Sequence, residues 1–165
     1  MKFVDEIVPE TQFINTRSES PMSVFKRLDH VSIGVHDMEA ARRLFVDVFG
    51  GVPLRDTGVN EREGFRWLTF KLGGKKVEIV SPTEPGAGGV GRYLAKHGEG
   101  FHHLSISVEN LDEAIRHFES QGLRVLAPNK SDPNWKHCYL HPQDTHGALI
   151  QVFEETPHSL AGAGE

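Results

Sequence analysis

The sequence of 165 residues has a single cysteine, Cys138, so no disulfide can form within the chain. This suits a reducing compartment, and we interpret Cys138 as a small buried residue on a strand. The first twenty-five residues contain four carboxylates and no apolar run long enough for a signal peptide or a membrane span. The net charge of −5 provides no positive field for nucleic acid. We therefore expect a cytoplasmic protein with no membrane and no nucleic-acid partner.

The sequence contains an internal repeat. When His30 is aligned with His103, an offset of 73 residues, seven of the sixteen pairs from His30/His103 to Phe45/Phe118 are identical. Unrelated stretches would share about one. The chain therefore contains two copies of one structural module.

Each copy predicts a strand, a helix and three further strands. In the first copy, Val31, Ile33 and Val35 alternate with polar or small residues, which indicates a strand with one face in a core. Asp37 is a plausible helix N-cap, and apolar residues then recur at helical spacing until Gly50. The predicted fold class is α+β, with two tandem βαβββ modules that form a curved mixed sheet with a metal-binding cleft.

The domain organisation follows from the limits of the repeat. Residues 1–26 are predicted to form an N-terminal arm and residues 156–165 a C-terminal tail. Between them, residues 27–82 form the first module, residues 83–99 a linker with a short helix, and residues 100–155 the second module. The linker formally contains G-x-G-x-x-G at residues 86–91, but the prolines before it and the short helix after it argue against a dinucleotide-binding unit. Contact of its backbone amides with a phosphate, for example of CoA, stays open.

The same offset pairs two polar residues that interrupt apolar strands. Glu78 lies within Val77–Val80, and Gln151 lies at the matching place in the second copy. The four residues His30, Glu78, His103 and Gln151 thus form two equivalent pairs, each with one imidazole and one oxygen ligand. This donor set suits one divalent ion such as Co, Ni, Mn, Zn or Fe and leaves positions for water or substrate. Each residue taken alone would have an ordinary structural explanation, but the shared offset favours a joint metal site.

Several motifs resemble the vicinal oxygen chelate superfamily, which includes glyoxalases, bleomycin resistance proteins and dioxygenases. The motifs are His-Val-Ser-Ile at 30–33, Val-Glu-Ile-Val-Ser-Pro at 77–82, Gly-Glu-Gly-Phe-His-His at 98–103, Leu-His-Pro at 140–142 and Gly-Ala-Leu-Ile-Gln at 147–151. Residues 81–103, with the Leu-His-Pro segment, are most similar to methylmalonyl-CoA epimerases, and glyoxalase I comes next. The resemblance implies metal ligation by His30, Glu78, His103 and Gln151, with His102 on the opposite side of its strand.

One departure from that family concerns the catalytic base. The epimerases and glyoxalases carry a glutamate where this chain has Gln151, and an amide cannot accept the proton. The carboxylate lies at the symmetric position instead, so Glu78 is the predicted catalytic residue. The second acid of the epimerases aligns near Trp67, which cannot act as a base. Available second proton carriers, each expected on the surface or in a loop, are His137, His141, His146, Glu61 and Glu63.

The predicted function is a metal-dependent epimerase or isomerase that abstracts a proton alpha to an acyl-CoA thioester through a metal-bound enolate. The alternatives are a lactoylglutathione lyase of the glyoxalase I type, an iron-dependent ring-cleaving dioxygenase, and a member that only binds a small molecule. The expected partner is a small-molecule substrate, and a homodimer is expected because open sheets leave edge strands.

Overall fold

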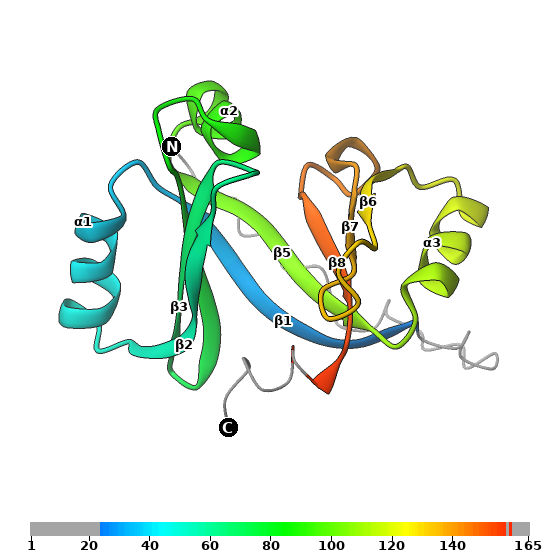
Figure 1. Cartoon of the computed structure of the whole chain (residues 1–165), viewed down its shortest axis with the longest axis horizontal. Coiled ribbons are helices and arrows are strands. Elements are labelled where there is room, and N and C mark those ends of the chain that lie inside the picture. The colour runs from blue at the N-terminus through cyan, green and yellow to red at the C-terminus, as the bar shows by residue number, and fades with distance from the viewer. Residues whose placement is uncertain (1–23, 158, 160–165) are drawn as a thin grey trace, which may run out of the picture.

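A computed structural model describes residues 24–157 and 159, in which eight strands form one open, curved mixed sheet (Figure 1). The strand order is β2-β3-β4-β1-β5-β8-β7-β6. The strands are β1 (Phe25–Gly34), β2 (Val52–Asn60), β3 (Phe65–Leu72), β4 (Lys75–Pro82), β5 (Gly100–Val108), β6 (Val125–Asn129), β7 (His137–Leu140) and β8 (Ile150–Glu154). The helices are α1 (Met38–Arg42), the π-helix η2 (Arg43–Val48), α2 (Gly88–His97), α3 (Leu111–Ser120) and the 3-10 helix η3 (Pro142–Asp144).

The sheet has an internal twofold symmetry that matches the sequence repeat. In the first module β1 runs parallel to β4, and in the second β5 runs parallel to β8. The modules join through β1 and β5, which pair antiparallel at the centre of the sheet. These long strands form the floor between two walls, β2-β3-β4 and β6-β7-β8 (Figure 1). The predicted fold class is confirmed, and the two modules pair within one chain.

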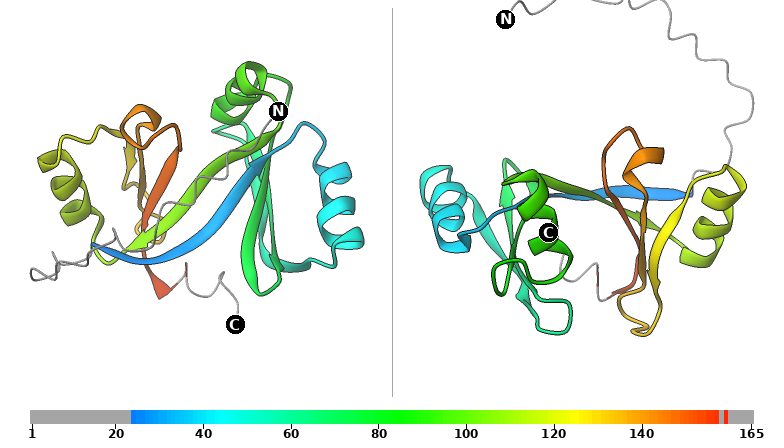
Figure 2. Two further views of the ribbon diagram at one scale, coloured as in Figure 1. Left: turned by 180° about the vertical axis from the view of Figure 1, so that it is seen from behind. Right: turned by 90° about the horizontal axis from the view of Figure 1, so that it is seen from above.

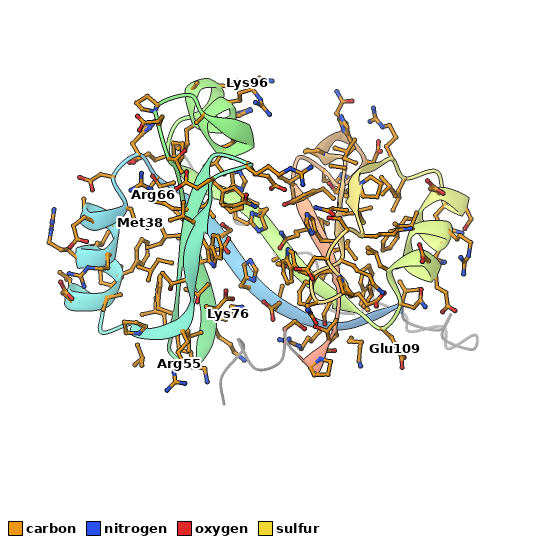
Figure 3. All side chains as sticks on the ribbon, viewed as in Figure 1. Met38, Arg55, Arg66, Lys76, Lys96 and Glu109 are labelled. Atoms are coloured by element: carbon orange, nitrogen blue, oxygen red, sulfur yellow. The ribbon has the colours of Figure 1, made fainter. Side chains whose placement is uncertain are left out.

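The outer helices cover the convex face of the sheet, one on each module (Figure 2). Asp37 caps α1 by accepting hydrogen bonds from the backbone N–H groups of Glu39 (3.0 Å) and Ala40 (2.9 Å). Met38 faces the sheet beside the fully buried Phe70 and Ile79 (Figure 3). The predicted helix ends where expected, but its second half is a π-helix. In the second module α3 packs over a separate buried core.

Helix α2 is longer than the sequence predicted. It covers ten residues and begins inside the glycine-rich stretch. Its buried residues Val90 and Leu94 pack on Val80 of β4, and this tertiary contact supports a helix whose glycines disfavour it locally. Gly91 fits there because a Cβ at that position would lie 2.4 Å from the backbone of Gly86.

The two predicted terminal segments lie largely outside the described residues. Residues 1–23 of the predicted arm are not described, while Phe25 and Lys26 already belong to β1. Of the predicted tail, residues 156, 157 and 159 are described. None of the helices in the described part of the chain combines the length and apolar character that a bilayer crossing needs.

Candidate metal centre

The register of the central strands brings the predicted ligands to the floor of the concave face. On β1, Ser32 lies opposite Glu78 of β4 on one side and opposite His103 of β5 on the other. The symmetry gives Ser105 of β5 the matching place between β1 and β8. Side chains on alternate positions of these strands therefore converge where the two modules meet.

Three of the four predicted ligands form one tight cluster. One ligand atom from each of His30, Glu78 and His103 lies within 4.8 Å of the other two. The Glu78 Oε1 atom is 3.6 Å from His30 Nε2 and 3.7 Å from His103 Nε2, which is too long for hydrogen bonds. All three atoms are buried and have no hydrogen-bond partner among the described residues.

The geometry of this cluster fits a divalent ion. Buried polar atoms without partners are rare, and each one requires a physical explanation. Two ligands about 2.1 Å from one ion at a tetrahedral angle lie about 3.4 Å apart, close to the separations seen here. Two imidazole nitrogens and a carboxylate oxygen are the donors that ions of the zinc and cobalt kind accept.

Gln151 lies next to the cluster with its polar atoms already engaged. Its side chain is 7% exposed. Its Oε1 accepts a hydrogen bond from Ser105 Oγ (2.8 Å), and its Nε2 donates to Tyr139 Oη (3.2 Å). An amide oxygen has a second lone pair, so these bonds leave one acceptor position free. Its role as a fourth ligand stays a prediction.

A buried carboxylate that the sequence reasoning missed holds the first histidine. Asp29 Oδ2 lies 2.7 Å from His30 Nδ1, so the carboxylate holds that nitrogen while Nε2 points to the cluster. Asp29 is itself held by Arg27 (2.5 Å) and by Lys76 (3.2 Å), which extends to Asp56 (2.9 Å). Lys76 is labelled on the inner side of the first module in Figure 3. Carboxylates that orient metal-binding histidines in this way are common second neighbours of an ion.

The second histidine has an equivalent support, which corrects one prediction. His102 was expected to face away from His103, but its Nδ1 lies 2.8 Å from His103 Nδ1. The reason is a β-bulge: Ser32 pairs with His103, whereas Ile33 pairs with Phe101, so His102 is an extra residue in β5. The bulge rotates His102 toward the side of the strand that carries His103.

The symmetry relates this bulge to one in β1. Leu28 pairs with Ile106 and His30 with Ser105, so Asp29 is the extra residue of β1. Asp29 and His102 are separated by the repeat offset, and each contacts Nδ1 of the histidine that follows it. The doubled Asp-His and His-His pairs were the available sequence signal, but strand alternation predicts that neighbours point apart.

Burial and neighbouring charges set the protonation of the cluster. Burial lowers the pKa of His30, but the carboxylates of Asp29 and Glu78 outweigh it and raise that pKa to about 9. Burial raises the pKa of Glu78, but His30 and His103 outweigh it and lower that pKa to about 2. For His103 burial dominates and lowers the pKa to about 3. At neutral pH the cluster therefore holds one titrating proton, on His30, which an ion would displace.

The predicted second proton carriers occupy different places. Glu61, Glu63 and His146 are exposed, as expected, and the half-buried His141 precedes η3. His137 is the exception, because it is 7% exposed and lies on β7, on the concave side. Trp67, on β3, donates a hydrogen bond from Nε1 to Asp56 (3.1 Å) and offers no base.

A curved sheet of two βαβββ modules with a buried His-Glu-His cluster at its floor defines a vicinal oxygen chelate protein. The symmetry of the two modules and the position of the cluster between them both agree with this class. The chain belongs to the Glyoxalase/Bleomycin resistance protein/Dioxygenase superfamily, whose family model matches residues 29–139.

Comparison with known proteins shows which members of this superfamily the chain resembles. The chain is 29% identical over 151 residues to the mitochondrial methylmalonyl-CoA epimerase of Mus musculus, with 87% of this chain and 80% of that protein covered. The crystal structure of methylmalonyl-CoA epimerase from Mycobacterium tuberculosis has a TM-score of 0.72 and 27% identity, covering 86% of this chain and 95% of that one. A Streptomyces coelicolor methylmalonyl-CoA epimerase variant in complex with 2-nitronate-propionyl-CoA has a TM-score of 0.71 and 30% identity, covering 81% and 96%. These similarities confirm the predicted resemblance to the epimerases.

Proposed function

We propose that this protein is a metal-dependent epimerase that removes and returns the proton alpha to an acyl-CoA thioester, with methylmalonyl-CoA as the first candidate substrate. The convergence of three buried, unpartnered ligand atoms from His30, Glu78 and His103 carries the proposal. The similarity to methylmalonyl-CoA epimerases supports an epimerase of this family.

His30, Glu78 and His103 would hold the ion, and Gln151 would add an amide oxygen. A bound divalent ion would supply positive charge to the oxygens on which negative charge develops as the proton leaves. Nitrogen and oxygen donors in this ratio suit Co, Ni, Mn, Zn or Fe. Asp29 and His102 fix the orientation of the two imidazoles.

Glu78 is the residue that we assign as the base. It is the only carboxylate of the proposed ligand set, because the matching position in the second module carries the amide of Gln151. Its pKa of about 2 keeps it ionised at neutral pH, so its oxygens can accept a proton from the substrate. A homodimer in the cytoplasm completes the proposal.

Deuterium exchange tests this function directly. Protein loaded with each candidate ion is incubated with methylmalonyl-CoA in D2O, and NMR follows deuterium at the alpha carbon and the conversion between epimers. We expect both in the unmodified protein. Glu78→Gln keeps an oxygen donor, so it should retain metal while epimerisation falls by about 10²–10⁴-fold. The matched control is Glu119→Gln, an exposed change on α3.

Two results would contradict the proposal. One is the lack of exchange with any 2-substituted acyl-CoA by the metal-loaded protein. The other is activity on the hemithioacetal of glutathione instead, which would make the protein a glyoxalase-type lyase.

A further inference from the structure

Inversion at a carbon atom needs proton transfer on both faces of the planar intermediate. If the proposed function holds, Glu78 reaches the substrate from β4, in the wall of the first module. The opposite face then requires a second proton carrier from the other wall. On that wall the amide of Gln151 cannot serve, and the phenol of Tyr139, whose pKa burial raises to about 12, accepts a hydrogen bond from Gln151.

The symmetry of the sheet identifies a candidate proton carrier on the second wall. In the first module Trp67 of β3 lies opposite Val80, two positions beyond Glu78 on β4. In the second module His137 of β7 lies opposite Phe153, two positions beyond Gln151 on β8. Val80 and Phe153 differ by the repeat offset, so His137 is the symmetric counterpart of Trp67.

His137 points to the concave face, not into the core of its module. On the same strand, Cys138 and Leu140 pack with α3 on the convex side. Because side chains alternate along a strand, His137 lies on the opposite side. The ring of His137 instead lies edge-on to Tyr139, with centroids 5.8 Å apart, and Tyr139 in turn lies 6.4 Å from His103. A row of three rings therefore leads from His137 to the proposed metal site.

The environment of His137 is that of a reactive group more than of a structural one. The residue is only 7% exposed, and its buried Nδ1 has no hydrogen-bond partner among the described residues. Its counterpart Trp67, in contrast, uses its Nε1 in a hydrogen bond to Asp56. Burial lowers the pKa of His137 and outweighs the backbone of Trp135 and the charge of Glu63, which both raise it, so a neutral imidazole lies on the concave face.

We propose that His137 is the second proton carrier of the epimerase and acts on the substrate face opposite to Glu78. For one epimer, neutral His137 takes the alpha proton and becomes an imidazolium. The electron pair of the C–H bond delocalises into the enolate, and Glu78, which has taken one proton from water before this step, returns that proton on the other face. For the other epimer, ionised Glu78 takes the alpha proton, and His137, which then carries the one proton of the pair, returns it. With one proton from water on the pair, atoms and charges balance in both directions.

His137→Gln tests the proposal because it removes the carrier on one face of the substrate and leaves Glu78 on the other. Glutamine matches the histidine in polarity but cannot take a proton. The variant should lose interconversion of the epimers by about 10²–10⁴-fold in D2O. It should still exchange the alpha hydrogen of one epimer, with configuration retained, because Glu78 can remove and return a proton on its own face. His117→Gln, an exposed change on α3, is the matched control and should keep the activity of the unmodified protein.

The remaining outcomes overturn the inference. His137 is not a carrier if His137→Gln keeps full epimerisation, if exchange of both epimers falls equally in folded, metal-loaded protein, or if only KM rises. If His137→Gln and His137→Asn fail to fold, the unmodified protein is followed in D2O during early turnover. With two carriers, the product contains deuterium and the remaining substrate stays unlabelled. A product that keeps the substrate's own hydrogen would refute two carriers. Lack of all exchange in the unmodified protein would instead refute the proposed function.

Discussion

Binding of a divalent ion at the His30, Glu78 and His103 cluster should release about one proton at neutral pH. The pKa of about 9 at His30 means that this imidazole is protonated at pH 7, whereas an ion needs its Nε2 lone pair. Glu78 and His103 have pKa values of about 2 and about 3, so neither holds a proton that the ion must displace near neutral pH. The proton comes from His30 alone.

The size of the pH effect on metal affinity follows from the competition between the proton and the ion for Nε2 of His30. With a pKa of about 9, about 1% of His30 is neutral at pH 7, so the apparent affinity there is about a hundredfold weaker than its limit at high pH. The affinity should therefore rise about tenfold for each pH unit between 6 and 8 and level off near pH 9.

Calorimetric titration with Mn²⁺ in two buffers of different ionisation enthalpy measures both quantities, the affinity and the number of protons released. Asp29→Asn is the sharpest companion variant. It removes the charge beside His30 Nδ1, so the plateau should move to lower pH, and the affinity limit at high pH should fall by about 10–100-fold. The reasoning fails if the affinity of the unmodified protein changes less than about threefold between pH 6 and 8, or if no proton is released.

Three further predictions concern the ligands, the charges and the core. His103→Ala should abolish tight metal binding and leave the far-ultraviolet circular dichroism spectrum nearly unchanged; metal content equal to that of the unmodified protein would remove His103 from the site. In the presence of a chelator, the metal-free protein should lose about 3 kcal/mol of its free energy of unfolding as the pH rises from about 6.5 to about 9. The reason is that protonated His30 stabilises the fold, and this contribution is lost as the pH rises through its raised pKa. Urea unfolding across this range measures the loss, and constant or rising stability would contradict it. Phe70→Ala should lower the free energy of unfolding by about 3–5 kcal/mol, since its fully buried ring packs 5.6 Å from that of Phe45; a loss below about 1 kcal/mol in the same assay would show that the core repacks.

The sequence by itself determined the two modules and the residues that face each other between them. The repeat offset paired His30 with His103 and Glu78 with Gln151, and it joined the four residues in one predicted metal site. These inferences needed only local patterns and one internal comparison, which is why they agree with the positions in the sheet.

Only the tertiary structure decided what supports those residues. The bulges at Asp29 and His102 break strand alternation, and they depend on the pairing of β1 with β5, which no local pattern contains. The burial of His137 depends in the same way on Trp135 and Phe153, which stack 5.0 Å apart beside it. Hydrophobic periodicity predicts which side of a strand is apolar, but the partners of a buried polar atom come from distant parts of the chain.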